Sequence, residues 1–113
     1  GAANLINVGS VQSGQVQLLG KLTAVDTAHA DNTMMQAAVR AEHISLAPVA
    51  EAGGAAVGTI EFMRDLGPST EIVVELDGES LRVRSPNVDC QGLSIGTQVA
   101  VSVDPSQVSV FKA

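Results

Sequence analysis

The chain has 113 residues, of which 45% are hydrophobic and 16% charged, and its 6 basic and 12 acidic side chains give a net charge of −6. This length fits one domain, and the apolar fraction is too high for disorder. Because there are two Phe and no Trp or Tyr, aliphatic residues must build the core. A net negative chain with so few aromatic side chains lacks the features that bind phosphate backbones and stack bases, so we expect no nucleic-acid partner.

Short runs of alternating or continuous apolar residues predict β-strands along the chain. The first three lie at residues 5–8, 16–19 and 35–39. Residues 26–32 and 50–56 combine turn formers with small side chains and have no periodicity, which predicts two loops.

A further strand is predicted at residues 59–66, with Ile60, Phe62 and Leu66 facing inward. The pair Gly67-Pro68 ends this strand, because proline cannot donate a hydrogen bond to the ladder. After two more strands, at residues 98–103 and 108–111, the chain ends.

Asp77-Gly78 predicts a tight hairpin, because both residues tolerate the positive φ of a type I′ turn. A two-residue loop fixes the register of the flanking strands. The core face then pairs Ile72 with Val83 and Val74 with Leu81. On the exposed face the register predicts two weak ion pairs, Glu71 with Arg84 and Glu75 with Arg82.

These elements predict an all-β fold: a small, OB-like antiparallel barrel or sandwich of about seven or eight short strands. Three glycines each precede a strand-like run. Because a glycine before a strand is ordinary turn chemistry, we expect no internal repeat from Gly14, Gly58 and Gly96.

The sequence contains no catalytic or metal-binding constellation. Its two histidines, His29 and His43, are interpreted as a solvated and a structural residue, and the oxygens of residues 26–32 follow no calcium-loop spacing. The single cysteine, Cys90, excludes an internal disulfide and has no neighbouring base to activate it as a nucleophile. No glycine-rich phosphate loop ending in Lys and Ser or Thr is present. We therefore predict no catalytic residue, no metal site and no cofactor in this chain.

Residues 39–46, Val-Arg-Ala-Glu-His-Ile-Ser-Leu, resemble the Val/Ile-Arg-Pro-Glu-His-Ile-x-Leu segment of the transport-associated OB (TOBE) domain of ABC importer ATPase subunits. Upstream, residues 1–5 are similar to that family's Gly-x-x-Asn-hydrophobic start. Segments downstream follow the family's order, so the resemblance covers nearly all of residues 1–113 as one domain. Ala41 departs from the usual Pro, which removes rigidity but no charge.

The resemblance implies a cytoplasmic, C-terminal regulatory domain that stabilises the dimer of an ATP-binding subunit serving a polyamine, iron, phosphonate or sugar importer. Since no Met precedes Gly1, we expect an ATPase domain upstream, which would bind ATP and Mg²⁺. The implied partners are a second copy of the subunit, the membrane permease subunits and a regulatory ligand or protein. The complex would lie on the inner face of the cell membrane.

The motif residues Arg40, Glu42 and His43 are candidates for a structural or interface role, of which we favour the structural one. The loop residues Gly67, Ser69 and Thr70 are candidates for ligand or partner contacts, because rigid barrels display recognition on loops. A different function remains open. Related OB domains bind oxyanions such as molybdate, so the alternative is a free-standing binding protein for small anions.

Overall fold

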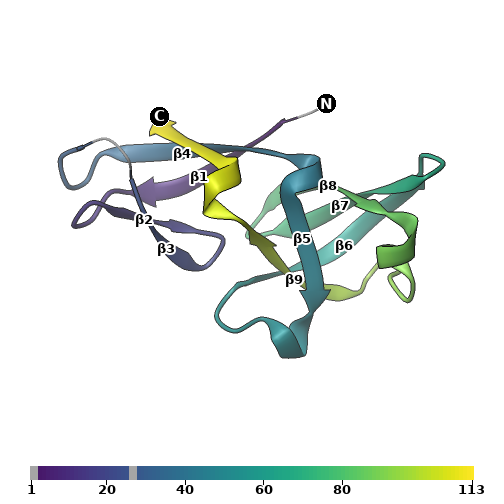
Figure 1. The fold of residues 1–113 in the computed structure, drawn as a ribbon. Helices are drawn as coiled ribbons and strands as arrows, with labels where there is room; N and C mark the ends of the chain where they lie inside the picture. The colour runs from purple at the N-terminus through teal and green to yellow at the C-terminus, as the bar shows by residue number, and fades with distance from the viewer. Residues whose placement is uncertain (1–2, 26–27) are drawn as a thin grey trace.

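The structure is a computed structural model that describes residues 3–25 and 28–113. The described residues form ten strands and four short 3₁₀ turns (Figure 1). This confirms the all-β, OB-like class. The strands are β1 (Ala3–Ser10), β2 (Gln15–Leu18), β3 (Lys21–Ala24), β4 (Met34–Arg40), β5 (Ile44–Pro48), β6 (Ala56–Asp65), β7 (Ser69–Leu76), β8 (Glu79–Pro86), β9 (Gln98–Val103) and β10 (Val108–Lys112). The turns are η1 (Ala41–His43), η2 (Val49–Glu51), η3 (Asn87–Cys90) and η4 (Pro105–Gln107).

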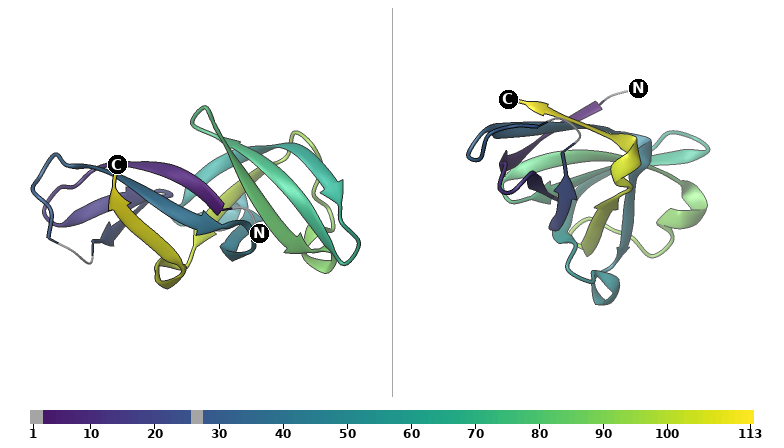
Figure 2. Two further views of the ribbon diagram at one scale, coloured as in Figure 1. Left: turned by 90° about the horizontal axis from the view of Figure 1, so that it is seen from above. Right: turned by 60° about the vertical axis from the view of Figure 1, so that its left-hand side comes forward.

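The strands form two lobes that lie side by side (Figures 1 and 2). The first lobe contains the sheet β1-β4-β10 and the hairpin β2-β3, and the second contains the five-stranded sheet β5-β9-β6-β7-β8. The lobes exchange strands: β5, which follows the first lobe's strands in the chain, pairs with β9, and the last strand β10 returns to pair with β4. Neither lobe is therefore complete without a strand from the other half of the chain.

The two lobes repeat one pattern of strand pairing. Ile44 lies opposite Val103 in the second lobe, just as Val108 lies opposite Val39 in the first. Since residues 39 and 103, and residues 44 and 108, are each 64 positions apart, the two crossovers β4–η1–β5 and β9–η4–β10 are equivalent.

The hairpin turns repeat as well: Leu19 and Gly20 have φ of 48° and 85°, and Asp77 and Gly78 have φ of 51° and 82°. The expectation of no internal repeat is thus wrong. The two hairpins share their backbone conformation but not their side chains. Leu19 takes a left-handed conformation where the second hairpin has Asp77. A search for glycine spacing does not detect this kind of repeat.

The core is aliphatic, as the composition predicts. Its largest fully buried side chains come from both lobes: Met35, Ile60, Ile72, Val11, Val16, Val39, Val74, Val83, Val99 and Val101. The hairpin register is confirmed, with Ile72 opposite Val83 and Val74 opposite Leu81. Burying such side chains is the main stabilising contribution to the fold.

Strand β6 differs from its prediction beyond Ile60. A bulge inserts Glu61 between the pairs Ile60 with Val74 and Phe62 with Val73, and this extra residue reverses the alternation of side chains. Phe62 is consequently 46% exposed and Leu66 37% exposed. The predicted inward placement of these two residues is wrong.

The predicted ion pairs of the hairpin do not form among the described residues. Glu71 contacts Arg64 on β6 at 3.1 Å between Oε1 and Nη2. Glu75 instead accepts a hydrogen bond from the backbone N–H of Gly78 at 2.8 Å. The reason is topological: β7 has neighbours on both sides, and Arg64 lies directly opposite Glu71 on the second side.

Candidate functional site

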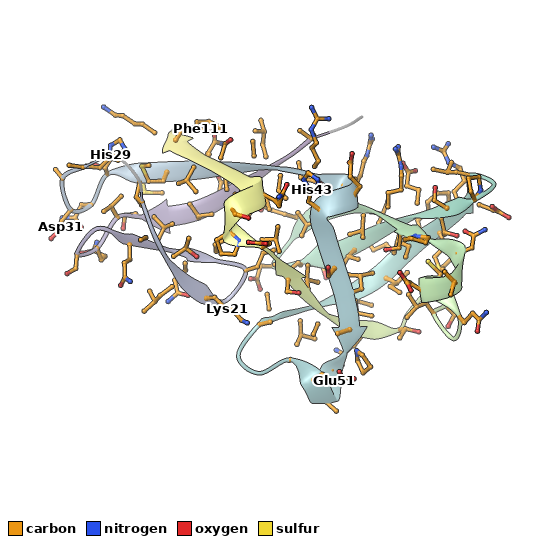
Figure 3. All side chains as sticks on the ribbon, in the orientation of Figure 1. Lys21, His29, Asp31, His43, Glu51 and Phe111 are labelled. Atoms are coloured by element: carbon orange, nitrogen blue, oxygen red, sulfur yellow. The ribbon has the colours of Figure 1, made fainter. Side chains whose placement is uncertain are left out.

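The two crossover turns border one cavity of about 290 Å³. Turn η1 connects β4 to β5, and its equivalent η4 connects β9 to β10. We call this site the crossover cavity. It is lined by Ala3, Ala38, Val39, Arg40, His43, Gln107 and Ser109. In Figure 3, His43 lies in the middle of the molecule, at the turn between β4 and β5.

The lining of the crossover cavity contains a guanidinium, an imidazole and neutral hydrogen-bond donors but no carboxylate. Arg40 is exposed and His43 half-buried, and Gln107 and Ser109 add an amide and a hydroxyl. A guanidinium beside neutral donors forms strong, charge-assisted hydrogen bonds with anionic oxygen atoms. The cavity is thus locally suited to an oxyanion even though the chain carries a net charge of −6.

The ring of His43 leaves one polar atom unsatisfied. Its Nδ1 is buried and has no hydrogen-bond partner in the described part of the chain. A buried polar atom without a partner costs about 1–3 kcal/mol, so packing rather than hydrogen bonding holds the imidazole in place. The ring therefore has hydrogen-bonding capacity unused beside the crossover cavity, and the structural role of His43 stays a prediction.

Glu42 lies in the same turn but does not line the crossover cavity. The backbone N–H of Glu42 donates to its own carboxylate, which lowers the pKa of that carboxyl, while burial opposes this effect. Three positive groups lower the same pKa further: His43, Arg40 and Arg84. The motif residues Arg40, Glu42 and His43 are therefore close together, but they do not all line the same cavity.

The polar groups of the predicted contact loop are hydrogen-bonded within the protein. Asn87 donates to the carbonyl of Gly67 at 2.5 Å and accepts from the hydroxyl of Thr70 at 2.7 Å. The N–H of Gly67 donates to Asp65 at 2.8 Å, and the carbonyl of Ser69 accepts from the N–H of Leu66 at 2.8 Å. These bonds hold the loop against η3. That Gly67, Ser69 and Thr70 contact a ligand stays a prediction.

The other residues considered in the sequence occupy separate places. His29 is half-exposed in the loop before β4, and the side chain of Cys90 is half-buried with its Sγ 3.4 Å from the carbonyl of Pro86. Residues 26 and 27 lie outside the described residues, as do residues 1 and 2 of the family-like start. Over residues 3–25 and 28–113, no three His, Cys, Asp or Glu side chains gather to hold a metal ion. Within the same ranges, no helix has the length and hydropathy needed to cross a membrane.

Comparison with known proteins gives a family match and a similarity to solved structures. The TOBE domain model matches residues 37–111, two-thirds of the chain. The chain belongs to the TOBE domain family. No curated protein sequence matches the TOBE chain. Its fold is similar to that of the cytoplasmic molybdate-binding protein ModG, crystallised with molybdate bound, with a TM-score of 0.74 at 14% identity. The similarity covers 97% of this chain and 96% of the ModG chain.

Sequence reasoning finds two of the four polar side chains that line the crossover cavity. It identifies Arg40 and His43 through the TOBE-like motif, but not Gln107 and Ser109. The missing signal is the repeat, because Gln107 occupies the position in η4 that His43 occupies in η1. Comparing residues 39–46 with residues 103–110 would have marked Gln107 as the equivalent of His43, but only the structure shows that both border one cavity.

Proposed function

We propose that this TOBE domain binds a small tetrahedral oxyanion, with molybdate and tungstate as the first candidates. The observation that carries the proposal is the similarity of nearly the whole chain to nearly the whole of ModG, a molybdate-binding protein. A protein of this kind needs no catalytic group, which agrees with the absence of catalytic motifs from the sequence. We further propose the cytoplasm as its location, since ModG is described as cytoplasmic.

The crossover cavity supplies the groups that this function requires. Arg40 contributes a permanent positive charge, and Gln107 and Ser109 contribute neutral donors. Hydrogen bonds to a charged partner contribute about 1.5–3 kcal/mol each, so a few of them offset the repulsion between an anion and an acidic protein. We expect Arg40 to be the side chain on which affinity depends most.

Calorimetry tests the proposal directly. The chain is titrated with sodium molybdate, tungstate and sulfate, and we expect heat of binding with at least one of them. Arg40→Gln should weaken binding roughly 10-fold to 100-fold, the equivalent of one charged hydrogen bond. Lys21→Gln removes the same charge from an exposed hairpin position that does not line the crossover cavity and should leave the affinity unchanged. No heat with any of the three anions would refute the proposal.

A second candidate places the domain in an ABC importer. The observation that favours it is the segment of residues 39–46, which resembles the TOBE domain of importer ATPase subunits. In that setting the domain regulates a dimeric ATPase whose other domain binds ATP and Mg²⁺ and contacts the permease at the membrane. Sequencing the reading frame upstream of residue 1 tests this candidate: a glycine-rich phosphate loop supports it, and a frame without one excludes it.

A further inference from the structure

A second cavity, of about 410 Å³, lies where the barrel of the second lobe closes. The edge strands of the five-stranded sheet are β5 and β8, and this cavity is lined by residues from both of them. We call it the seam cavity. Its volume falls within the range of about 300–1,000 Å³ typical of small-molecule sites. The lining residues on which the argument depends are Glu42, Ile44, Leu46, Arg84, Asp89 and Leu93.

The seam cavity combines an apolar surface with charges of both signs. Ile44 is 2% exposed, and the half-buried side chains of Leu46 and Leu93 extend the apolar part. Arg84 contributes a positive charge, and Glu42 and Asp89 contribute carboxylates. Two serine hydroxyls complete the polar part.

The charges of the seam cavity are not paired with one another. Among the described residues no carboxylate oxygen lies within 4.0 Å of the guanidinium of Arg84, and its Nε is buried without a hydrogen-bond partner. Glu71, directly opposite Arg84 in the ladder, contacts Arg64 instead. A half-buried, unpaired guanidinium loses hydration without a compensating contact, so it is available to a carboxylate from outside the chain.

The first lobe provides an internal comparison for these charges. Its corresponding cavity is lined by Ser106, Val108 and Val110, which are the repeat equivalents of Glu42, Ile44 and Leu46. The remaining lining residues there are Leu18, Thr23, Ala24 and Pro105, so none of its side chains is charged. Because the same fold closes there without ionisable groups, the charges of the seam cavity are not a requirement of the fold.

We propose that the seam cavity binds a free α-amino acid with an aliphatic side chain. The ligand's carboxylate would pair with Arg84, its ammonium group with Glu42 or Asp89, and its side chain would lie on Ile44, Leu46 and Leu93. The buried Nε of Arg84 gains a partner from the carboxylate of a zwitterion, and the exposed carboxylates of Glu42 and Asp89 attract its ammonium group but repel a simple anion. The site is separate from the crossover cavity and does not depend on oxyanion binding.

Titration of the chain with L-leucine tests the proposal, with binding followed by calorimetry or by NMR shifts. We expect L-leucine to bind, and two analogues to bind at least tenfold more weakly. The first analogue, 4-methylpentanoate, lacks the ammonium group, and the second, 3-methylbutylamine, lacks the carboxylate. Equal binding of 4-methylpentanoate and L-leucine would overturn the zwitterion assignment, and no binding of L-leucine at millimolar concentration would overturn the site.

Two variants locate the binding site. Arg84→Gln should weaken L-leucine binding at least tenfold, while Arg82→Gln, on the same strand and outside the cavity, should bind as the wild type does. Unchanged L-leucine binding by Arg84→Gln would refute the assignment. A circular-dichroism spectrum and a melting temperature like those of the wild type would show that Arg84→Gln is folded, so this test does not rely on the proposed oxyanion site.

Discussion

The side-chain amide of Asn4 pairs with the backbone of Arg82 as a neighbouring strand would. Its Nδ2 donates to the carbonyl of Arg82 at 2.8 Å, and its Oδ1 accepts from the N–H of Arg82 at 2.8 Å. Strand β8 is an edge of the five-stranded sheet, so these two backbone groups have no strand partner on that side. Asn4 is 8% exposed and belongs to β1 of the other lobe. One side chain thus covers an open sheet edge and joins the two lobes.

Asn4→Ala is expected to destabilise the protein by about 1–3 kcal/mol, because it leaves both backbone groups of Arg82 without their partner at a partly buried site. Urea unfolding followed by circular dichroism measures this change. Asn7→Ala, on the same strand but exposed, serves as the control and should cost no more than about 0.5 kcal/mol. Equal losses of unfolding free energy in the two variants would show that the hydrogen bonds of Asn4 to Arg82 do not contribute specifically to stability.

The parts of the fold that follow from local rules were predictable. The Asp77-Gly78 turn fixed the register of β7 and β8, because both residues adopt positive φ as their types allow. The features that were not predicted depend on contacts between residues distant in sequence. Glu71 has two cross-strand neighbours, and only the topology decides that Arg64 rather than Arg84 pairs with it.

The exchange of strands between the two lobes was not predicted either. The sequence analysis therefore missed Gln107 and Ser109, which line the candidate site. β3 and β5 were not predicted as strands, since β3 offers only the exposed Leu22 as a large apolar residue and β5 follows its motif without a turn signal. The first hairpin was not predicted because Leu19 in its turn has a positive φ, a backbone conformation that leucine rarely takes. Without these elements, nothing in the sequence brought η4 beside Arg40 and His43.

The close approach of β6 to β7 at Gly58 gives a prediction about packing. A Cβ added at Gly58 would lie 2.5 Å from Val74 Cγ1 and 2.7 Å from the carbonyl oxygen of Glu75. Gly58→Ala should therefore destabilise the fold by about 1–3 kcal/mol through overpacking. Thermal unfolding measures the loss. The neighbouring Val57→Ala, at a position 41% exposed, should change stability much less, and a neutral Gly58→Ala variant would show that β6 and β7 do not approach this closely at Gly58.

The repeat predicts a stabilising substitution at Ala41. Its equivalent in η4 is Pro105, which stands at the first position of the turn. Arg40, the residue before Ala41, already has ψ of 146°, the conformation that a following proline requires. Ala41→Pro should thus raise the free energy of unfolding by about 0.4–1 kcal/mol by restricting the unfolded chain. A lower melting temperature for this variant would mean that the ring clashes at this buried position and that the two turns are not interchangeable.

Acid should weaken the second crossover turn through Asp104. The backbone N–H of Ser106 donates to Asp104 Oδ1 at 3.0 Å and its hydroxyl donates at 2.9 Å, and these two bonds lower the pKa of the carboxyl below 3.8. Because the folded pKa is lower than the unfolded one, the stabilisation is fully present above the unfolded value. It is lost as the pH falls through the folded value.

The test compares melting temperatures of the wild type and Asp104→Asn over a series of pH values. Asparagine keeps an acceptor for the N–H of Ser106 but does not titrate, so the advantage of the wild type at neutral pH should shrink as the solution is acidified below the unfolded pKa of Asp, about 3.9. Ser106→Ala, which removes the hydroxyl donor alone, should reduce this pH-dependent difference in part. A difference that stays constant throughout the series would show that the carboxylate of Asp104 does not stabilise the turn.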